Sequence, residues 1–247
     1  MKTFFYNVII LSLFIASCNN KKETSKTAIT EEIKKDSAIV NGSPCDIKLS
    51  SIHFTKAVNG ADSLIKKEAN EKIIFKAGEK SDYFSDPDGK LSNTTAPMLL
   101  SKVDNTKPFT LTAKVTPEFT AKGLYNAGVL YIYVNDSFYQ KFCFEQDERG
   151  NHRIVTVRTM GTSDDNNHDV VKQPSVYMKI SSDTKTVASY YSIDKKNWQM
   201  VRLYKNNYPK EIWMGISTQC PIDKGTQSNF EEIALEEKSV SDFRLGI

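Results

Sequence analysis

The sequence predicts an all-β protein, a sandwich or jelly roll of antiparallel strands. Three observations support this. Residues 109–115 alternate Phe, Leu, Ala and Val with Thr and Lys, the period of two that marks a half-buried strand. Similar short segments follow at regular spacing with polar turns between them, and no long segment with a helical period interrupts them.

After residues 109–115, the remaining predicted strands share short length, apolar content and flanking turn residues. In order, they are 126–134, 138–146, 152–159, 176–180, 187–193, 198–204, 212–217 and 230–235. Residues 147–151 and 194–197 are rich in Asp, Asn, Lys and Gly, which favours hairpin turns between neighbouring strands.

The N-terminus predicts export. A basic start at Lys2 is followed by an apolar run over residues 4–15, which is too short to span a bilayer but fits a signal peptide. Residues 15–18, Ile-Ala-Ser-Cys, resemble the lipobox of bacterial lipoproteins. Residues 1–17 are therefore expected to be removed and Cys18 to carry lipid, which places the chain in the cell envelope at the outer membrane. The sequence leaves open which side it faces.

The predicted domain organisation has two further parts. Residues 18–45 are polar and lack aromatic residues, which predicts a flexible tether after the lipidated cysteine. Residues 46–247 form the predicted β-sandwich. The formal net charge of +3 is close to neutral, so the sequence shows no electrostatic footprint for nucleic acid.

The chain has 4 cysteines. With Cys18 lipidated, Cys45, Cys143 and Cys220 remain, an odd number that allows at most one intramolecular bridge. Cys143 lies between two phenylalanines in a strand pattern and is predicted to be a buried thiol. A bridge between Cys45 and Cys220 stays open, and no pair has the close spacing of zinc ligands.

A candidate ligand face follows from the period of two. If residues 126–134, 138–146 and 152–159 form a meander, their aliphatic faces stack into one core. The opposite face then gathers aromatic and charged side chains, namely Tyr131, Tyr133, Lys141, Glu145, His152 and Arg158. Aromatic rings beside charged hydrogen-bonding groups suit a sugar. The alternative interpretation is an ordinary solvated face.

Two other features have a functional and an ordinary interpretation. Trp198 lies opposite aliphatic neighbours, either as a second stacking ring or as a packing residue beside a turn. Residues Asp164, Asp165 and Asn166 offer oxygens at short spacing, either as calcium ligands or as a solvated turn; the run does not match an EF-hand loop.

Several short stretches carry a family resemblance. They are YNAGV (125–129), KFCFE (141–145), VTVR (155–158) and YSID (191–194) followed by Trp198. They resemble a family catalogued as a domain of unknown function, sometimes under the name "regulation of enolase", and the resemblance runs from about Tyr83 to Ile247. It implies a concanavalin-A-like jelly roll of two antiparallel sheets with a concave face, and no established activity. Because such folds include lectins and glycoside hydrolases, the resemblance implies carbohydrate as the ligand class.

Three functions stay open, with a non-catalytic carbohydrate-binding domain favoured. A glycoside hydrolase or lyase would need paired carboxyls, and Glu145 and Asp147 have the spacing of two that would place them on one face of a strand, although residues 147–150 are better interpreted as a turn. Residues 145–148 faintly resemble the acidic strand of laminarinase-like enzymes, but Arg149 and Gly150 stand where a third acid belongs. Glu145 is therefore the one catalytic candidate. The third possibility is an envelope scaffold that binds protein.

Overall fold

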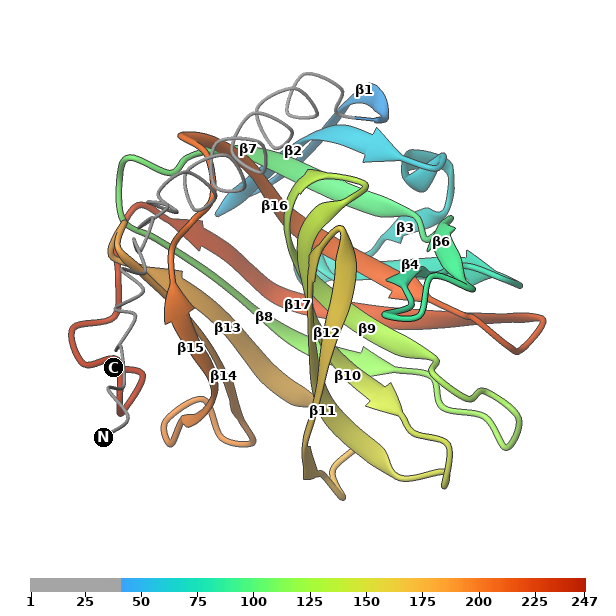
Figure 1. Cartoon of the computed structure of the whole chain (residues 1–247). Coiled ribbons are helices and arrows are strands. Elements are labelled where there is room, and N and C mark those ends of the chain that lie inside the picture. The colour runs from blue at the N-terminus through green and yellow to red at the C-terminus, as the bar shows by residue number, and fades with distance from the viewer. Residues whose placement is uncertain (1–40) are drawn as a thin grey trace, which may run out of the picture. The chain divides into compact units, whose positions relative to one another are not determined.

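The architecture consists of two large antiparallel sheets packed face to face (Figure 1). A computed structural model describes residues 41–247. The first sheet has the strand order β1 (Ser43–Leu49), β2 (Ile52–Val58), β7 (Met98–Asp104), β16 (Glu211–Gln219), β9 (Ala127–Asn135), β10 (Phe138–Gln146), β11 (His152–Met160) and β12 (Thr162–Val170).

The second sheet lies beneath the first. Its order is β15 (Gln199–Lys205), β14 (Thr186–Ser192), β13 (Val176–Ser182), β8 (Phe109–Pro117), β17 (Gly225–Glu236), β4 (Ile73–Gly78) and β3 (Ile65–Lys67). A separate hairpin pairs β5 (Tyr83–Ser85) with β6 (Ser92–Thr94), and two single 3₁₀ turns, η1 (Ala61–Ser63) and η2 (Ala69–Glu71), precede it. The all-β sandwich predicted from the sequence is confirmed.

The main core lies between the two sheets. Alternate residues of each strand point inward, so Phe142 and Phe144 of β10 meet Leu111 of β8 in one buried apolar cluster. The complementary residues of β9 and β10 point away from this core, and β9 has no exposed residue on either face. The outer face of the first sheet is therefore covered over part of its area.

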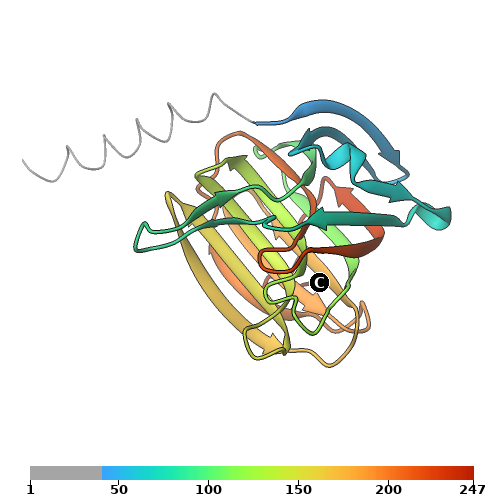
Figure 2. The ribbon, with the colours of Figure 1, turned by 90° about the vertical axis from the view of Figure 1, so that its right-hand side faces the viewer.

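The β5–β6 hairpin provides this cover (Figure 2). Tyr83 of β5 makes edge contacts with Tyr131, Tyr133 and Tyr139, with ring centroids 5.5–6.3 Å apart. The hydroxyls of Tyr83 and Tyr133 both donate to Asp136 Oδ1, at 3.0 and 2.6 Å. These contacts form a second apolar cluster on the outer face, beside the cavity described below.

The strand predictions hold where the apolar alternation is strong. The strand predicted at 138–146 has the bounds of β10, and the predicted turns at 147–151 and 194–197 connect β10 to β11 and β14 to β15. The interpretation of Asp164, Asp165 and Asn166 as a solvated turn is wrong, because all three lie in the edge strand β12. An edge strand with polar residues on both faces lacks the alternation that identifies buried strands.

The ordered sheet begins slightly before the predicted domain boundary at residue 46, since β1 starts at Ser43. The predicted signal peptide, Cys18 and residues 18–40 of the tether lie outside the described residues. Between residues 41 and 247, no helix has the length and apolar content needed to span a membrane.

The cysteines of the described region are free thiols. Cys143 is fully buried, as predicted. Cys45 Sγ contacts the Phe54 carbonyl and Cys220 Sγ the Asp223 carbonyl, so the bridge between Cys45 and Cys220 is absent.

Candidate ligand-binding site

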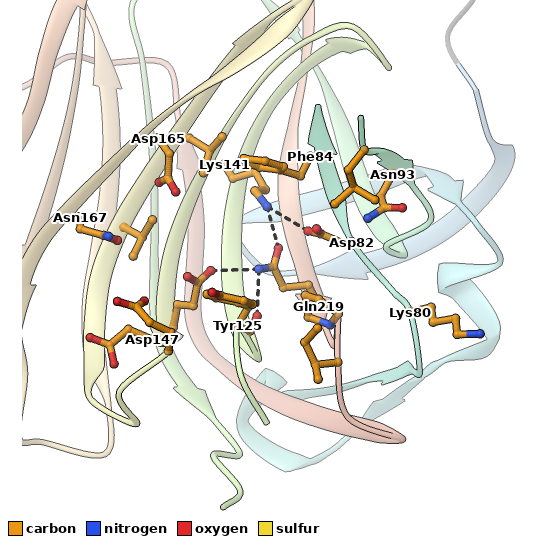
Figure 3. A pocket seen from close by; sticks show the side chains of 17 residues that line it. Lys80, Asp82, Phe84, Asn93, Tyr125, Lys141, Asp147, Asp165, Asn167 and Gln219 are labelled. Atoms are coloured by element: carbon orange, nitrogen blue, oxygen red, sulfur yellow. Dashed lines mark hydrogen bonds and ion pairs between the residues drawn. The ribbon is translucent and has the colours of Figure 1, made fainter. Parts of the chain in front are cut away.

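A cavity of about 550 Å³ opens on the outer face of the first sheet, beside the tyrosine cluster (Figure 3). This volume lies within the roughly 300–1,000 Å³ of small-molecule sites. Strands β10, β11, β12 and β16 form its floor, and the β5–β6 hairpin and the segment before β9 form its walls.

Strand register places the floor residues in three rows. Lys141 of β10 pairs with Val157 of β11, which in turn pairs with Asp165 of β12. Directly paired residues point to the same face, and so do residues two apart on one strand. Lys141 and Glu145 thus form a polar row, Val155 and Val157 an apolar row, and Asp165 and Asn167 a second polar row.

Four side chains are connected at the bottom of the cavity (Figure 3). Lys141 Nζ donates to Asp82 Oδ1 and to Gln219 Oε1, both at 3.1 Å. Gln219 Nε2 donates to the Tyr125 carbonyl and to Glu145 Oε2, both at 3.0 Å. Because an ammonium group can only donate, it fixes the amide with its oxygen toward Lys141 and its nitrogen toward Glu145.

This network keeps hydrogen-bonding capacity for a ligand. Lys141 has three N–H donors, of which two are used, and Glu145 Oε1 accepts no bond within residues 41–247. All four side chains are largely buried, with Gln219 1% and Glu145 8% exposed. Buried polar groups with unused capacity favour a polar ligand at this position.

Burial and neighbouring charges set the ionisation of the site. Burial raises the pKa of Glu145 to about 8, although the charge of Lys141 opposes this, so Glu145 holds a proton at pH 7. Burial is the largest single influence and would lower the pKa of Lys141, but Asp82 and the other acidic neighbours together outweigh it, so the net shift is upward. Burial also raises the pKa of Asp165, against the opposing charge of Lys141.

The walls of the cavity add aromatic and apolar surface. Phe84 of the hairpin lies with its ring centroid 5.7 Å from Lys141 Nζ. Tyr125 is 38% exposed at the rim and has a positive φ of 65°, which an aromatic residue rarely adopts. Its N–H donates to the Gln146 carbonyl at 2.7 Å, and its carbonyl accepts from Gln219, so the fold holds this conformation from both sides.

Of the six residues predicted to share one face, the structure brings Lys141 and Glu145 together in the cavity. Tyr131 and Tyr133 do point to the same side of the sheet, but both are fully buried beneath the hairpin. The expectation that they form an open platform for a sugar is therefore wrong. The sequence gives no sign that Tyr83 covers them.

The predicted meander is confirmed as β9, β10 and β11, but His152 and Arg158 belong to its opposite face, which corrects the predicted faces of the third strand. Phe142 pairs with Thr156, so the even-numbered residues of β11 point into the sandwich while Val155 and Val157 point outward. His152 stacks on Phe119 at 3.8 Å, and Arg158 lies over the ring of Tyr204 at 4.5 Å. Assigning the valines to the core by their hydrophobicity reversed the faces of this strand.

Trp198 lies just before β15, in the second sheet, and therefore outside the cavity. Lys179 Nζ sits 3.6 Å from its ring centroid, and the backbone near Gly246 packs against it. Of its two sequence-based interpretations, the structure supports the packing residue.

The predicted calcium ligands do not converge on one point. They follow one another along β12, so Asp164 and Asn166 point to one face and Asp165 to the other. Asp164 pairs with Arg202 at 2.5 Å, whereas Asp165 lines the cavity. Within residues 41–247, no group of three or more His, Cys, Asp or Glu side chains is arranged to hold a metal ion.

Asp147 does not act as a second carboxyl for Glu145. It accepts hydrogen bonds from the Arg149 and Asn151 backbone at 2.9 and 2.8 Å, and from Arg153 Nε at 3.1 Å. Burial alone would raise its pKa, but these hydrogen bonds outweigh it and the pKa is lowered. The carboxylate stabilises the β10–β11 turn.

Sequence reasoning missed Asp82, Tyr125 and Gln219 as site residues. Asp82 and Gln219 reach Lys141 from positions 59 and 78 residues away in the sequence, and no local pattern signals that approach. Tyr125 lies next to the predicted strand at 126–134, in a segment quoted only for its family resemblance. Its exposure and backbone conformation are properties of the folded chain.

Comparison with known proteins identifies the fold and a family. A family model described as "Protein of unknown function (DUF1349)" matches residues 61–238. No curated protein matches the chain at a significant level. A functionally unknown protein from Saccharomyces cerevisiae is similar in structure, with a TM-score of 0.66 and 20% identity over 74% of this chain and 96% of that one.

Longer carbohydrate-active proteins also resemble the chain. A GH43 protein from Bacillus licheniformis has a TM-score of 0.57 and 14% identity, and a xylan β-1,4-xylosidase from Bacillus halodurans has a TM-score of 0.54 and 12% identity. Each match covers 78% of this chain but only 38% of the other protein. At these identities the likeness shows the fold, a concanavalin-A-like jelly roll.

Proposed function

The chain belongs to the family of proteins of unknown function DUF1349, and from that starting point we propose that it is a non-catalytic carbohydrate-binding domain with its site in the cavity above β10, β11 and β12. The family supplies no activity, so the proposal depends on the chemistry of the cavity. The carbohydrate-active proteins that share the fold support it as analogy.

The single observation that carries the proposal is the arrangement of the three rows on the floor. Val155 and Val157 form an apolar strip, flanked by Lys141 and Glu145 on one side and by Asp165 and Asn167 on the other. A pyranose has the matching pattern, because its ring carbons present apolar C–H surface and its hydroxyls project around the rim. The unused N–H of Lys141 and the protonated Glu145 are suited to bind those hydroxyls.

The size and the closed end of the cavity favour a short saccharide or the end of a chain. The Ser85 N–H of β5 donates to Ser163 Oγ of β12 at 3.0 Å, so the hairpin spans the sheet from its middle to its edge. Beyond this crossing, the tyrosine cluster fills the outer face. An extended polysaccharide therefore cannot continue through that side of the site.

Calorimetric titration of the protein with a panel of soluble oligosaccharides tests this function. We expect at least one to bind, and Tyr125→Ala to weaken that binding about twofold to tenfold, since aromatic contacts contribute roughly 0.5–1.5 kcal/mol. Trp198→Ala removes an aromatic residue of the other sheet and is the matched control, with unchanged affinity. A panel without any binding contradicts the proposal.

A second candidate is glycoside hydrolysis through Glu145. It is favoured by one observation, the pKa of about 8, because a general acid must hold its proton at neutral pH. Asp165 is the other carboxyl of the cavity that lacks an ion-pair partner within residues 41–247, and it would serve as the base.

We further propose that lipid on Cys18 anchors the protein in the cell envelope, at the outer membrane, so that the cavity meets ligands outside the cytoplasm. Fractionation of cells tests this anchor. The wild-type chain is expected in the membrane fraction, and Cys18→Ala is expected to leave that fraction while keeping its saccharide affinity. Membrane association that survives the substitution contradicts it.

A further inference from the structure

The cavity is lined by more carboxyl groups than ammonium groups, and only some of these carboxyls form ion pairs. The lining contains five carboxyls and the two lysines Lys80 and Lys141. Asp82 pairs with Lys141 at 3.1 Å, and Asp147 with Arg153 at 3.1 Å. Glu148 pairs with Arg149 at 3.0 Å in an exposed ion pair.

Glu145 and Asp165 remain without an ion-pair partner in the described chain. They stand on the two polar rows of the floor, on either side of the valines. Lys141 forms its ion pair with Asp82, and its charge only partly offsets the effect of burial on Glu145 and Asp165. Lys80 is exposed at the rim. The interior of the cavity therefore contains fewer cationic groups than carboxyl groups.

Tyr125 adds an aromatic surface at the same place. It lines the cavity together with Glu145, Glu148 and Asp165, and burial, followed by the neighbouring carboxyls, raises its pKa. An aromatic face beside carboxylates is the arrangement that binds organic cations, because both attract positive charge. The phenol ring is 38% exposed and accessible to such a ligand.

We propose that the saccharide recognised here carries a free amine, as in a deacetylated amino sugar, bound with its ammonium group between Asp165, Glu145 and the Tyr125 ring. This inference rests on the proposed carbohydrate-binding function and specifies its ligand class. The ammonium group supplies the charge that the interior lacks, and the hydroxyls use the free N–H of Lys141. An acidic sugar would add a further negative charge to the site.

Proton uptake and release provide an independent sign of this binding mode. An ammonium group stabilises the ionised form of a neighbouring carboxyl, so Glu145 loses its proton when the amine binds. At about pH 5.5 the amine of the free sugar is already protonated and Glu145 still holds its proton, so binding of an amino sugar is expected to release protons to the buffer. A neutral sugar in the same cavity leaves Glu145 protonated.

The test compares three oligosaccharides of equal length by calorimetry at about pH 5.5 in two buffers of different ionisation enthalpy. They are a glucosamine oligomer, its N-acetylated form and an oligogalacturonate. We expect the glucosamine oligomer to bind roughly tenfold to a hundredfold more tightly than the N-acetylated form, as expected for one charged hydrogen bond. We also expect its enthalpy to depend on the buffer, and the oligogalacturonate not to bind.

Asp165→Asn is expected to abolish most of the preference for the amine, measured as the ratio of the affinities for the glucosamine oligomer and for its N-acetylated form. Asp164→Asn is the matched control, because its side chain leaves the opposite face of the same strand toward Arg202. Equal or tighter binding of the N-acetylated form overturns the amine proposal and leaves carbohydrate binding intact. A preference that survives Asp165→Asn also overturns it, and the absence of any saccharide binding overturns both proposals.

Discussion

Glu145 and Gln219 meet above Ala127. Both residues pair with Ala127 of β9, from the two neighbouring strands β10 and β16. Strands on either side of a third are roughly 10 Å apart, so their side chains can touch only if the residue between them is small. Gln219 Nε2 reaches Glu145 Oε2 at 3.0 Å, and this bond joins the two sides of the cavity floor.

Gln219→Leu is expected to lower the free energy of unfolding by about 2–4 kcal/mol. The substitution removes the hydrogen bonds of Gln219 to Lys141, to Glu145 and to the Tyr125 carbonyl, and it leaves buried polar groups with fewer partners. Urea denaturation measures the loss. Gln199→Leu, on an exposed position of β15, is the control and is expected to change stability by less than about 0.5 kcal/mol. Equal stability of the two variants contradicts a structural role for the network.

The sequence predicts the parts of this site that follow from local alternation. The bounds of β10 and the shared face of Lys141 and Glu145 both follow from the period of two within one segment. For β11 the same reasoning fails, because Val155 and Val157 are apolar yet point into a covered outer face. Hydrophobicity reports burial, and it cannot tell which of two buried faces a residue occupies.

The residues that complete the site come from distant segments. Asp82 lies just before the short strand β5, and Asp165 lies in an edge strand whose polar residues resemble a turn. Their positions depend on which strands pair and where the hairpin crosses the sheet. Those are long-range properties that no single segment of the sequence encodes.

The raised pKa of Glu145 predicts a pH dependence of stability. Between pH 4.5 and about 8, the folded protein keeps this proton while the unfolded chain, with a pKa near the ordinary 4.5, releases it. The folded state then binds more protons, so the free energy of unfolding falls as pH rises, by up to about 1.4 kcal/mol per pH unit from this group. Below pH 4.5 the contribution is fully present, and above about 8 it is lost.

Glu145→Gln tests this sign, because glutamine resembles the protonated acid at every pH. Its stability relative to the wild type is expected to rise steadily from pH 4.5 to 8, measured by urea denaturation at each pH. Glu148→Gln changes a half-exposed carboxyl on the adjacent turn and serves as the control, with no such trend. A pH-independent difference for Glu145→Gln shows that Glu145 ionises normally in the folded state.

Assays of reducing ends separate the two candidate functions. A non-catalytic binding domain is expected to release no reducing ends from a polysaccharide panel, above the background of a heat-denatured sample. Release that disappears in both Glu145→Gln and Asp165→Asn favours the hydrolase instead, since each carboxyl has an essential role in that reaction. Asp164→Asn controls for the loss of charge on β12. Release that persists in all three variants excludes this cavity as the source.

Tyr125 allows the backbone and the ring to be tested separately. Its φ of 65° is a costly conformation for any residue with a Cβ atom, whereas glycine adopts it freely. Tyr125→Gly and Tyr125→Ala both remove the ring, so both are expected to lose saccharide affinity to the same extent. Tyr125→Gly is expected to be more stable than Tyr125→Ala by about 1 kcal/mol, because alanine must still adopt the positive φ.

Lys195 has a φ of 63° in the β14–β15 turn, outside the cavity. The same pair of substitutions at Lys195 is expected to show the same difference in stability with no change in saccharide binding. Equal stability of Tyr125→Gly and Tyr125→Ala would show that the backbone relaxes at this position, and saccharide affinity retained by either variant would exclude the ring from the binding site.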